Sequence, residues 1–172
     1  MRRFGDRSRF AIEVGDFYGD IDSARRVDVW AAGVWLTCDD NNASVPFFAG
    51  RLQCAVGSLL VDPTYRRLGM PYPELPVAEN FRRLRAEDDN TDYLAYLFMD
   101  WGPTADNVSM LLFREGGTAY LPFAFHRPDH HDPSGLGRVF VAELPERELA
   151  RVLHDAAWFV IWAWADRSKW PR

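Results

Sequence analysis

A cluster of histidines and carboxylates in the last third of the chain has the residue types of a metal site. It contains His126, His130 and His131, with carboxylates at Asp129 and Asp132, and imidazole and carboxylate groups are ligands that zinc and iron sites use. The spacing matches neither a helical His-Glu-x-x-His motif nor a paired-cysteine knuckle. Because prolines and a glycine place the cluster in a loop, the sequence favours a solvated loop, and we expect no bound metal and no other cofactor.

Other residue types that perform catalysis occur without the partners that catalysis requires. Cys38 and Cys54 fall at apolar positions of predicted strands, which indicates small core residues rather than activated thiolates. Ser58 and Ser109 lack the Gly-x-Ser-x-Gly elbow of a serine hydrolase. His154 lies where a predicted helix changes from a polar to an apolar surface, and a polar residue there needs no catalytic explanation. The sequence therefore predicts no catalytic residues.

Acidic residues gather in two predicted turns. One turn contains Asp39 and Asp40, and the other contains Glu87, Asp88 and Asp89. Paired carboxylates can hydrolyse glycosides, but neither turn shows a means of raising one pKa, as that reaction requires. Solvated turns are the simpler interpretation. The functional hypothesis that remains is an acidic docking surface for a basic protein partner.

The chain contains 7 tryptophans, a number that favours either a bulky core or a recognition surface. Most of them should lie in the core, yet with so many we expect one or two to be partly exposed. Trp170 is the best candidate, because it follows the polar segment 166–169 near the C-terminal end. An exposed aromatic residue of this kind is a common anchor for a protein partner.

The hydrophobic periodicity predicts the strands and helices that position these residues. Predicted strands cover residues 8–18, 26–38, 47–61, 92–99, 108–113, 118–125 and 138–144, and predicted helices cover residues 75–88 and 144–167. Pro122 indicates that its strand lies at a sheet edge or carries a break. Strands in runs, joined by short turns, are typical of an antiparallel α+β fold. We expect the order βββαββββα, with one mid-chain helix and a long C-terminal helix packed on a sheet of about seven strands.

The predicted C-terminal helix is the element around which the rest of the chain is organised. Its first half carries Leu149, Val152, Leu153 and Ala156 at three- and four-residue spacing, which indicates one buried face. Its second half, AAWFVIWAWA, is apolar on all sides and has to be covered on more than one of them. That segment is too short to span a bilayer. We expect a sheet on one side and a loop or another protein on the other.

Composition and charge restrict the class of protein further. A length of 172 residues suits a single domain over residues 1–172, and a net charge of −5 gives no general attraction to nucleic acid but suits a basic partner. The basic N-terminal segment is followed by no apolar signal-peptide region. We therefore expect a cytoplasmic protein without a membrane anchor. With 2 cysteines, free thiols are a simpler interpretation than a disulfide scaffold.

The order of several segments resembles immunity protein family 42, a family of small bacterial proteins associated with polymorphic toxin systems. The matching segments are FGDRSRFAIEV, VWAAGVWL, GRLQCAVGSLLV, LPVAENFRRL, FMDWGPTADNVSMLLFREGGTAYLPFAF and FVAELPERELARVLHDA. The loop at 127–137, the polar insert at 20–26 and the aromatic C-terminal end depart from the family pattern. The resemblance implies that the protein binds and neutralises a cognate toxin, that it is not an enzyme, and that it has no catalytic residues.

Three functional hypotheses follow. In the first, the protein is an immunity protein that occludes a basic toxin, which its acidic turns steer and an exposed tryptophan anchors. The candidate contact residues are Asp39, Asp40, Glu87, Asp88, Asp89 and Trp170. In the second, the loop residues His126, His130 and His131 serve a metal-dependent hydrolase. In the third, the protein is a self-associating structural protein, a homodimer that buries the aromatic helix against its own copy.

Overall fold

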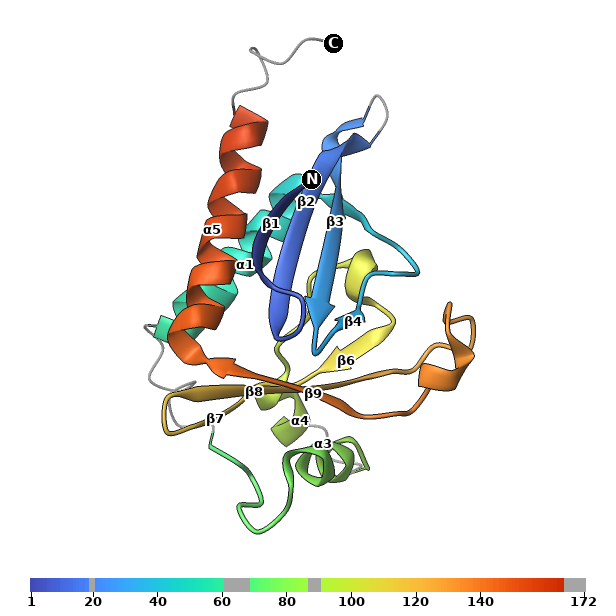
Figure 1. Ribbon diagram of the computed structural model, residues 1–172, viewed down its shortest axis with the longest axis vertical. Helices are drawn as coiled ribbons and strands as arrows, with labels where there is room; N and C mark the ends of the chain where they lie inside the picture. The colour runs from blue at the N-terminus through green and yellow to red at the C-terminus, as the bar shows by residue number, and fades with distance from the viewer. Residues whose placement is uncertain (19–20, 61–68, 87–90, 166–172) are drawn as a thin grey trace.

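The computed structural model describes residues 1–18, 21–60, 69–86 and 91–165 (Figure 1). Within these residues the chain forms antiparallel sheets and helices, with a long helix at the C-terminal end, which confirms the α+β prediction. The order of elements differs in detail from βββαββββα, because two segments predicted as strands are largely helical. The predicted contact residues Glu87, Asp88, Asp89 and Trp170 lie outside the described residues.

The first sheet contains five strands, with β1 and β4 at the two ends of its main path. Its order is β1 (Arg2–Asp6), β2 (Phe10–Tyr18), β3 (Ile21–Ala31) and β4 (Val34–Trp35), and β5 (Asn42–Ser44) also pairs with β3. Phe4 pairs with Ile12, and Ile12 pairs with Val29, so apolar residues of one parity share a face. Ala32 and Gly33 make the tight turn between β3 and β4 at positive φ, so the predicted strand at 26–38 is divided in two.

The second sheet is built around β8 (Thr118–Phe125). It pairs with β9 (Phe140–Pro145) and with β6 (Val108–Met110) and β7 (Phe113–Glu115). The predicted edge position of Pro122 is wrong, because β8 is the central strand. The break falls instead between β6 and β7, where the Leu111 N–H donates to the Pro122 carbonyl oxygen and Pro122 has no N–H to donate in return.

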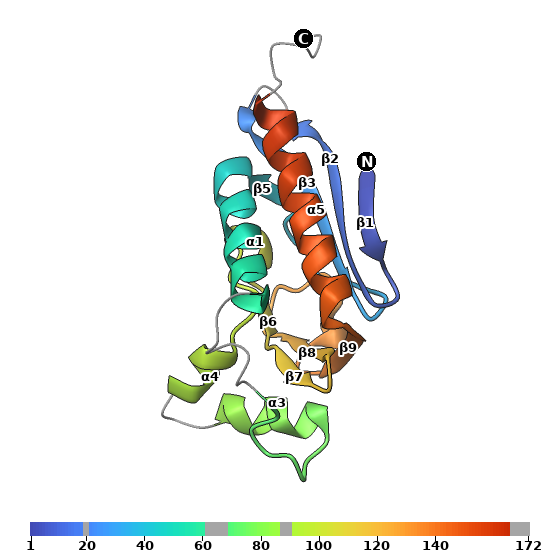
Figure 2. The same ribbon diagram turned by 90° about the vertical axis from the view of Figure 1, so that its left-hand side faces the viewer.

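Two long helices, α1 (Val45–Leu60) and α5 (Glu146–Ala165), pack against each other and against the first sheet (Figure 2). The predicted strand at 47–61 is therefore wrong. Its residues Phe48, Leu52 and Leu59 are buried at helical spacing, whereas Cys54 is exposed, so the prediction of a core cysteine there is also wrong. Cys54 alternates with polar neighbours in the manner of a strand residue, and that short alternation concealed the longer helical period.

Shorter helices lie beyond the second sheet, at the opposite end of the molecule from the C-terminal end of α5 (Figure 1). α3 (Val77–Ala86) falls within the predicted helix and buries Phe81 and Leu84. The predicted strand at 92–99 is wrong over most of its length, because Thr91–Tyr96 forms α4 and Leu97 makes only a single bridge, to Leu111. Two 3₁₀ turns, η1 (Pro103–Ala105) and η2 (Pro133–Gly135), precede β6 and β9.

The main core lies between the first sheet, the two long helices and the second sheet. Phe10, Phe48 and Phe123 are among its largest fully buried side chains, one from each of these three parts. The buried face of α5 carries Leu149, Val152, Leu153, Ala156 and Val160, as the spacing predicted. Across the described residues, no helix has both the length and the hydropathy that crossing a bilayer requires.

Candidate functional site

The structure brings together two residues that the sequence placed in separate candidate sites, Asp39 and His130. Asp39 lies in the turn after β4, and His130 lies in the loop after β8, 91 positions later. His130 Nδ1 is 2.8 Å from Asp39 Oδ2, and the His131 backbone N–H donates to Oδ1 over 2.7 Å. The side-chain amide of Asn107 also donates to Oδ2. One carboxylate therefore joins the acidic turn to the histidine loop.

The neighbours of the Asp39 carboxylate fix the protonation of this cluster. An ionised carboxylate only accepts hydrogen bonds, so the His130 nitrogen that faces it carries a proton. Burial raises the pKa of Asp39, but hydrogen bonds from His130, His131 and Asn107 outweigh burial and hold that pKa below its ordinary value. The His130 side chain is only 2% exposed, and its ring stacks on Phe125 with 3.9 Å between centroids. The cluster therefore connects the turn after β4 rigidly to the loop after β8.

Cys38 lies beside this pair and completes a group that could hold a metal ion. The ligand atoms of Cys38, Asp39 and His130 lie within 4.8 Å of one another, and no other such group occurs among the residues that the structure describes. Burial raises the pKa of the Cys38 thiol to about 11, so the thiol is protonated near neutral pH and is a poor nucleophile. Both oxygens of Asp39 are already engaged by N–H donors. These residues fit a hydrogen-bonded cluster better than a metal centre.

The three loop histidines do not gather around one point. Of His126, His130 and His131, only His130 belongs to the group that could hold a metal. Burial, with nearby arginines, lowers the pKa of His126, and His131 reaches Asp39 through its backbone. The ligand set of the metal-dependent hydrolase hypothesis is therefore not assembled in this structure. A cavity of about 570 Å³ opens beside the loop and β4.

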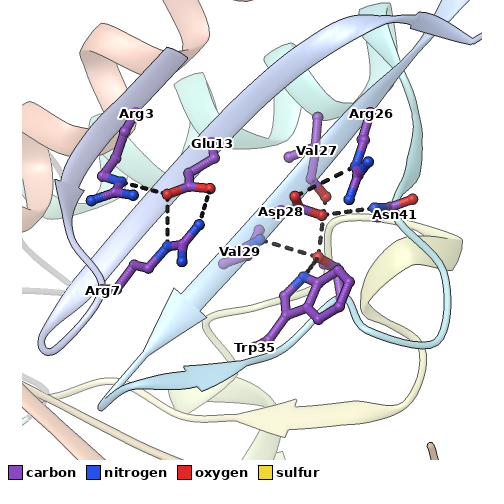
Figure 3. Close-up of polar contacts among 10 residues, drawn as sticks. Arg3, Arg7, Glu13, Arg26, Val27, Asp28, Val29, Trp35 and Asn41 are labelled. Carbon is purple, nitrogen blue, oxygen red and sulfur yellow. Dashed lines mark hydrogen bonds and ion pairs between the residues drawn. The ribbon is translucent and has the colours of Figure 1, made fainter. Parts of the chain in front are cut away.

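The face of the first sheet that turns away from the helices carries a second polar cluster, which the sequence analysis did not predict (Figure 3). Glu13 on β2 is 2% exposed and accepts hydrogen bonds from Arg7, at 2.7 and 2.8 Å, and from Arg3. These bonds, chiefly those from Arg7, hold the pKa of Glu13 below its ordinary value. Directly opposite on β3, Asp28 accepts from Asn41 at 2.7 Å. The alternation of side chains along β2 and β3 could have indicated that Glu13 and Asp28 share one face of the sheet. Two carboxylates that face each other require cationic neighbours.

A groove of about 480 Å³ lies between α5 and the edge strand β1. Figure 2 shows α5 with α1 on one side and β1 on the other. On α5, Trp158 and Trp162 are 45% and 65% exposed, and their ring centroids are 6.4 Å apart. Phe4 and Phe159 also line the groove and pack against each other at 5.6 Å. This strip belongs to the half of the helix for which the sequence predicted a second cover.

Positive charge borders this groove on the β1 side. The Arg2 guanidinium lies 5.4 Å from the ring centre of Phe4 and 4.8 Å from that of Phe159. Arg25, which is 6% exposed, lies 5.5 Å from the same Phe159 ring, and burial lowers its pKa. Its Nη1 atom has no hydrogen-bond partner. Within the described ranges, neither Arg2 nor Arg25 forms an ion pair with a carboxylate.

The structure places the predicted contact residues unevenly. Asp40 is exposed, but the neighbouring Asp39 directs both carboxylate oxygens to internal donors. We expected one or two partly exposed tryptophans, with Trp170 as the best candidate, whereas three are exposed among the described residues, Trp158, Trp162 and Trp164. Their signal was present in the sequence, because an amphipathic helix cannot bury aromatic residues on every side of its last turns.

Comparison with known proteins gives one structural similarity. No protein-family model matches the chain, and no curated protein matches it in sequence. Among solved structures, it is similar to the crystal structure of CdiI from Burkholderia dolosa AUO158, with a TM-score of 0.60 and 14% sequence identity. The alignment covers 90% of this chain and 97% of that chain. Membership of immunity protein family 42 stays a prediction, whereas the overall fold is one that this CdiI shares.

Proposed function

We propose that this protein is a bacterial immunity protein that binds a cognate toxin in the cytoplasm and neutralises it by stoichiometric contact. The observation that carries the proposal is the fold, which aligns with 97% of CdiI, a contact-dependent inhibition immunity protein. The resemblance of the ordered sequence segments to immunity protein family 42 supports the same class independently.

Neutralisation of this kind requires a preformed surface and no chemical reaction. The sheets and long helices share one core, so a surface carried by them is held on rigid elements. The exposed tryptophans of α5 have the character of binding anchors, because large aromatic side chains dominate the energetics of protein interfaces. A toxin seated on such a surface is blocked sterically from its own substrate.

Long-range attraction between opposite charges assists the encounter in this proposal. The chain has a net charge of −5, and a basic toxin is attracted to it before contact. Asp40 and the predicted patch Glu87, Asp88 and Asp89 remain our candidates for this steering role, with Asp39 in a weaker position because its oxygens are engaged. Reversing Asp88 and Asp89 to lysine should slow association and reduce its dependence on salt. Unchanged association at low salt contradicts the steering role.

The reagent that tests the function is a cognate toxin domain, which the proposal expects in the reading frame next to this gene. We expect a one-to-one complex by size-exclusion chromatography with light scattering, and restored growth of cells that express both proteins. A toxin domain from an unrelated system serves as the control and should be neither bound nor neutralised. Absence of a complex, or a complex that leaves toxicity unchanged, contradicts the proposal.

A further inference from the structure

We infer that the groove between β1 and α5 is the toxin-binding surface and that it receives an acidic segment of the toxin carrying an apolar side chain. The inference rests on the proposed function and adds to it a location and a chemistry. Three features of the groove carry the inference: an exposed aromatic strip, arginines along one wall, and a wall fixed by a glycine.

The aromatic strip runs along one side of α5. Trp158 lies between His154 and Trp162, with centroid distances of 6.1 and 6.4 Å, so the three rings follow one another along successive turns. Single exposed apolar residues are ordinary on protein surfaces, but a contiguous strip of large rings is typical of a binding surface. Because tryptophan is enriched at the centres of interfaces, we assign this strip to an apolar side chain of the toxin.

The charges that line the groove favour an acidic ligand. Two cations, Arg2 and Arg3, and a single carboxylate, Asp155, line the groove. The Asp155 Oδ1 atom lies 3.1 Å from the His154 ring nitrogen Nδ1. Arg3 also binds Glu13, yet its side chain remains 54% exposed. The groove therefore has an excess of positive charge on the wall formed by β1.

The buried guanidinium of Arg25 strengthens this argument. It lies against Phe159 and Phe17, at 5.5 and 4.6 Å, and donates through Nε to the Gly15 carbonyl oxygen. Burial lowers the pKa of Arg25 more than the nearby charge of Asp16 raises it, so the desolvation of this cation is only partly compensated. A carboxylate that enters the neighbouring groove and meets Arg2 lowers that cost. Arg25 thus adds a third positive charge to those of Arg2 and Arg3, and all three favour a negatively charged ligand in the groove.

Gly5 fixes the separation of the two walls. Its φ is +87°, and a Cβ atom there would lie 2.3 Å from the Phe10 carbonyl oxygen and 2.9 Å from a methyl group of Val152 on α5. Only glycine allows β1 to approach the helix so closely. The groove is therefore formed before the toxin arrives, which reduces the ordering cost of binding.

An acidic segment is compatible with a toxin that is basic overall. Net charge governs attraction at distances near the Debye length, whereas the contact itself is governed by local complementarity. The acidic turn at Asp40 lies beyond β4, and the groove lies beside β1, at the opposite end of the sheet path. Steering and docking are consequently assigned to different parts of the molecule.

The experiment measures binding of the neighbouring toxin domain to full-length variants by surface plasmon resonance. We expect Trp162→Ser and Trp158→Ser each to weaken affinity at least about tenfold, mainly through faster dissociation. Arg2→Glu should weaken affinity about tenfold, and a lysine substitution of the facing toxin carboxylate should restore it. Leu94→Ser and Arg82→Glu are matched controls, because both side chains are exposed on other helices, and both should bind as the wild type does.

The outcomes separate this inference from the function on which it rests. If the wild type binds the toxin and all three groove variants bind it equally well, the groove is not the binding surface, although the function stands. If the wild type does not bind at all, the proposed function fails. A dimer of the wild type that Trp162→Ser abolishes, without a change in toxin affinity, assigns the groove to a second copy and overturns the inference. Hydrogen exchange of the complex should show protection in residues 2–6 and 154–162.

Discussion

At the β4 end of the first sheet, Asp39, Asn107 and His130 satisfy one another, whereas at the β1 end Trp158 and Trp162 lie open to solvent. The first region contains residue types associated with catalysis, and the second contains residue types associated with a core. In the folded chain neither region has the role that its residue types suggest. The polar cluster holds two loops together, and the apolar strip is available to a partner.

The difference follows from what each region leaves unsatisfied. Hydrogen-bonding groups that find partners inside the protein have little left to offer a ligand, as the Asp39 carboxylate shows. Exposed aromatic surface can still contribute favourable free energy to binding, because burial against a partner removes it from water. Unsatisfied groups, rather than reactive residue types, are the basis on which we infer the binding surface.

The largest effect that we predict is at the β4 end. Asp39→Ala removes the acceptor of His130, His131 and Asn107 and should lower the free energy of unfolding by about 3 kcal/mol. Urea denaturation measures the change. Asp40→Ala is the matched control, with an expected change below about 0.5 kcal/mol. Equal effects of the two substitutions would mean that the hydrogen bonds of Asp39 do not stabilise the fold as we describe.

The next effect concerns the wall of the groove. Gly5→Ala places a methyl group against Phe10 and Val152 and should lower the free energy of unfolding by about 2 kcal/mol. It should also weaken toxin binding, since β1 has to move away from α5. Gly33→Ala tests positive φ alone, because no atom lies near its added methyl group. A Gly5 variant that is less stable but binds normally separates the wall from the binding surface.

A smaller effect depends on pH at the outer face between the two ends. The pKa of Glu13 lies below its ordinary value of 4.5, so its ion pairs stabilise the folded state above that pH and are lost as pH falls through the folded-state pKa. Glu13→Gln should cost about 1–2 kcal/mol at pH 7 and reduce the loss of stability on acidification below pH 4.5. Denaturation midpoints between pH 7 and pH 3 give the comparison. An unchanged acid limb contradicts this role.

The smallest predicted change in stability belongs to the groove itself. Trp162→Ser should alter the free energy of unfolding by less than about 0.5 kcal/mol, because the side chain is mostly exposed. Thermal and urea unfolding, set beside the toxin affinity of the same variant, complete the comparison with Asp39→Ala. One substitution acts on stability and the other on binding. A strongly destabilised Trp162 variant would show that the strip belongs to the core.

Periodicity predicted the elements whose pattern is long. β2 and the first half of α5 were predicted because each keeps one period over its length, and the α+β class followed from them. α1 was missed because Cys54 and its neighbours alternate for a few residues in the manner of a strand, while Phe48, Leu52 and Leu59 show the helical period only over about three turns. Short alternations are weak evidence when the segment is long enough for a helix.

The sequence identified the separate segments of the candidate sites, but it did not show which segments meet in the fold. The histidine loop and the acidic turn were each identified, but a separation of 91 positions gives no local signal that His130 meets Asp39. The groove was anticipated in a different form, since the apolar end of the last helix required a second cover that the described residues do not fully supply. What the sequence could not show was that Arg2 lies beside that helix, because strand pairing places it there.

The exposed side chains that line the groove lie beside buried ones along the chain, so recognition and folding depend on different residues. Along β1, Arg2 and Arg3 are exposed while Phe4 is partly buried, and along α5 the exposed tryptophans share turns with the buried residues Ala157 and Val160. Replacing the outward residues changes which protein is recognised without repacking the interior. If the protein is the immunity protein that we propose, a lineage under pressure from new toxins can therefore diversify its specificity while it keeps the same scaffold.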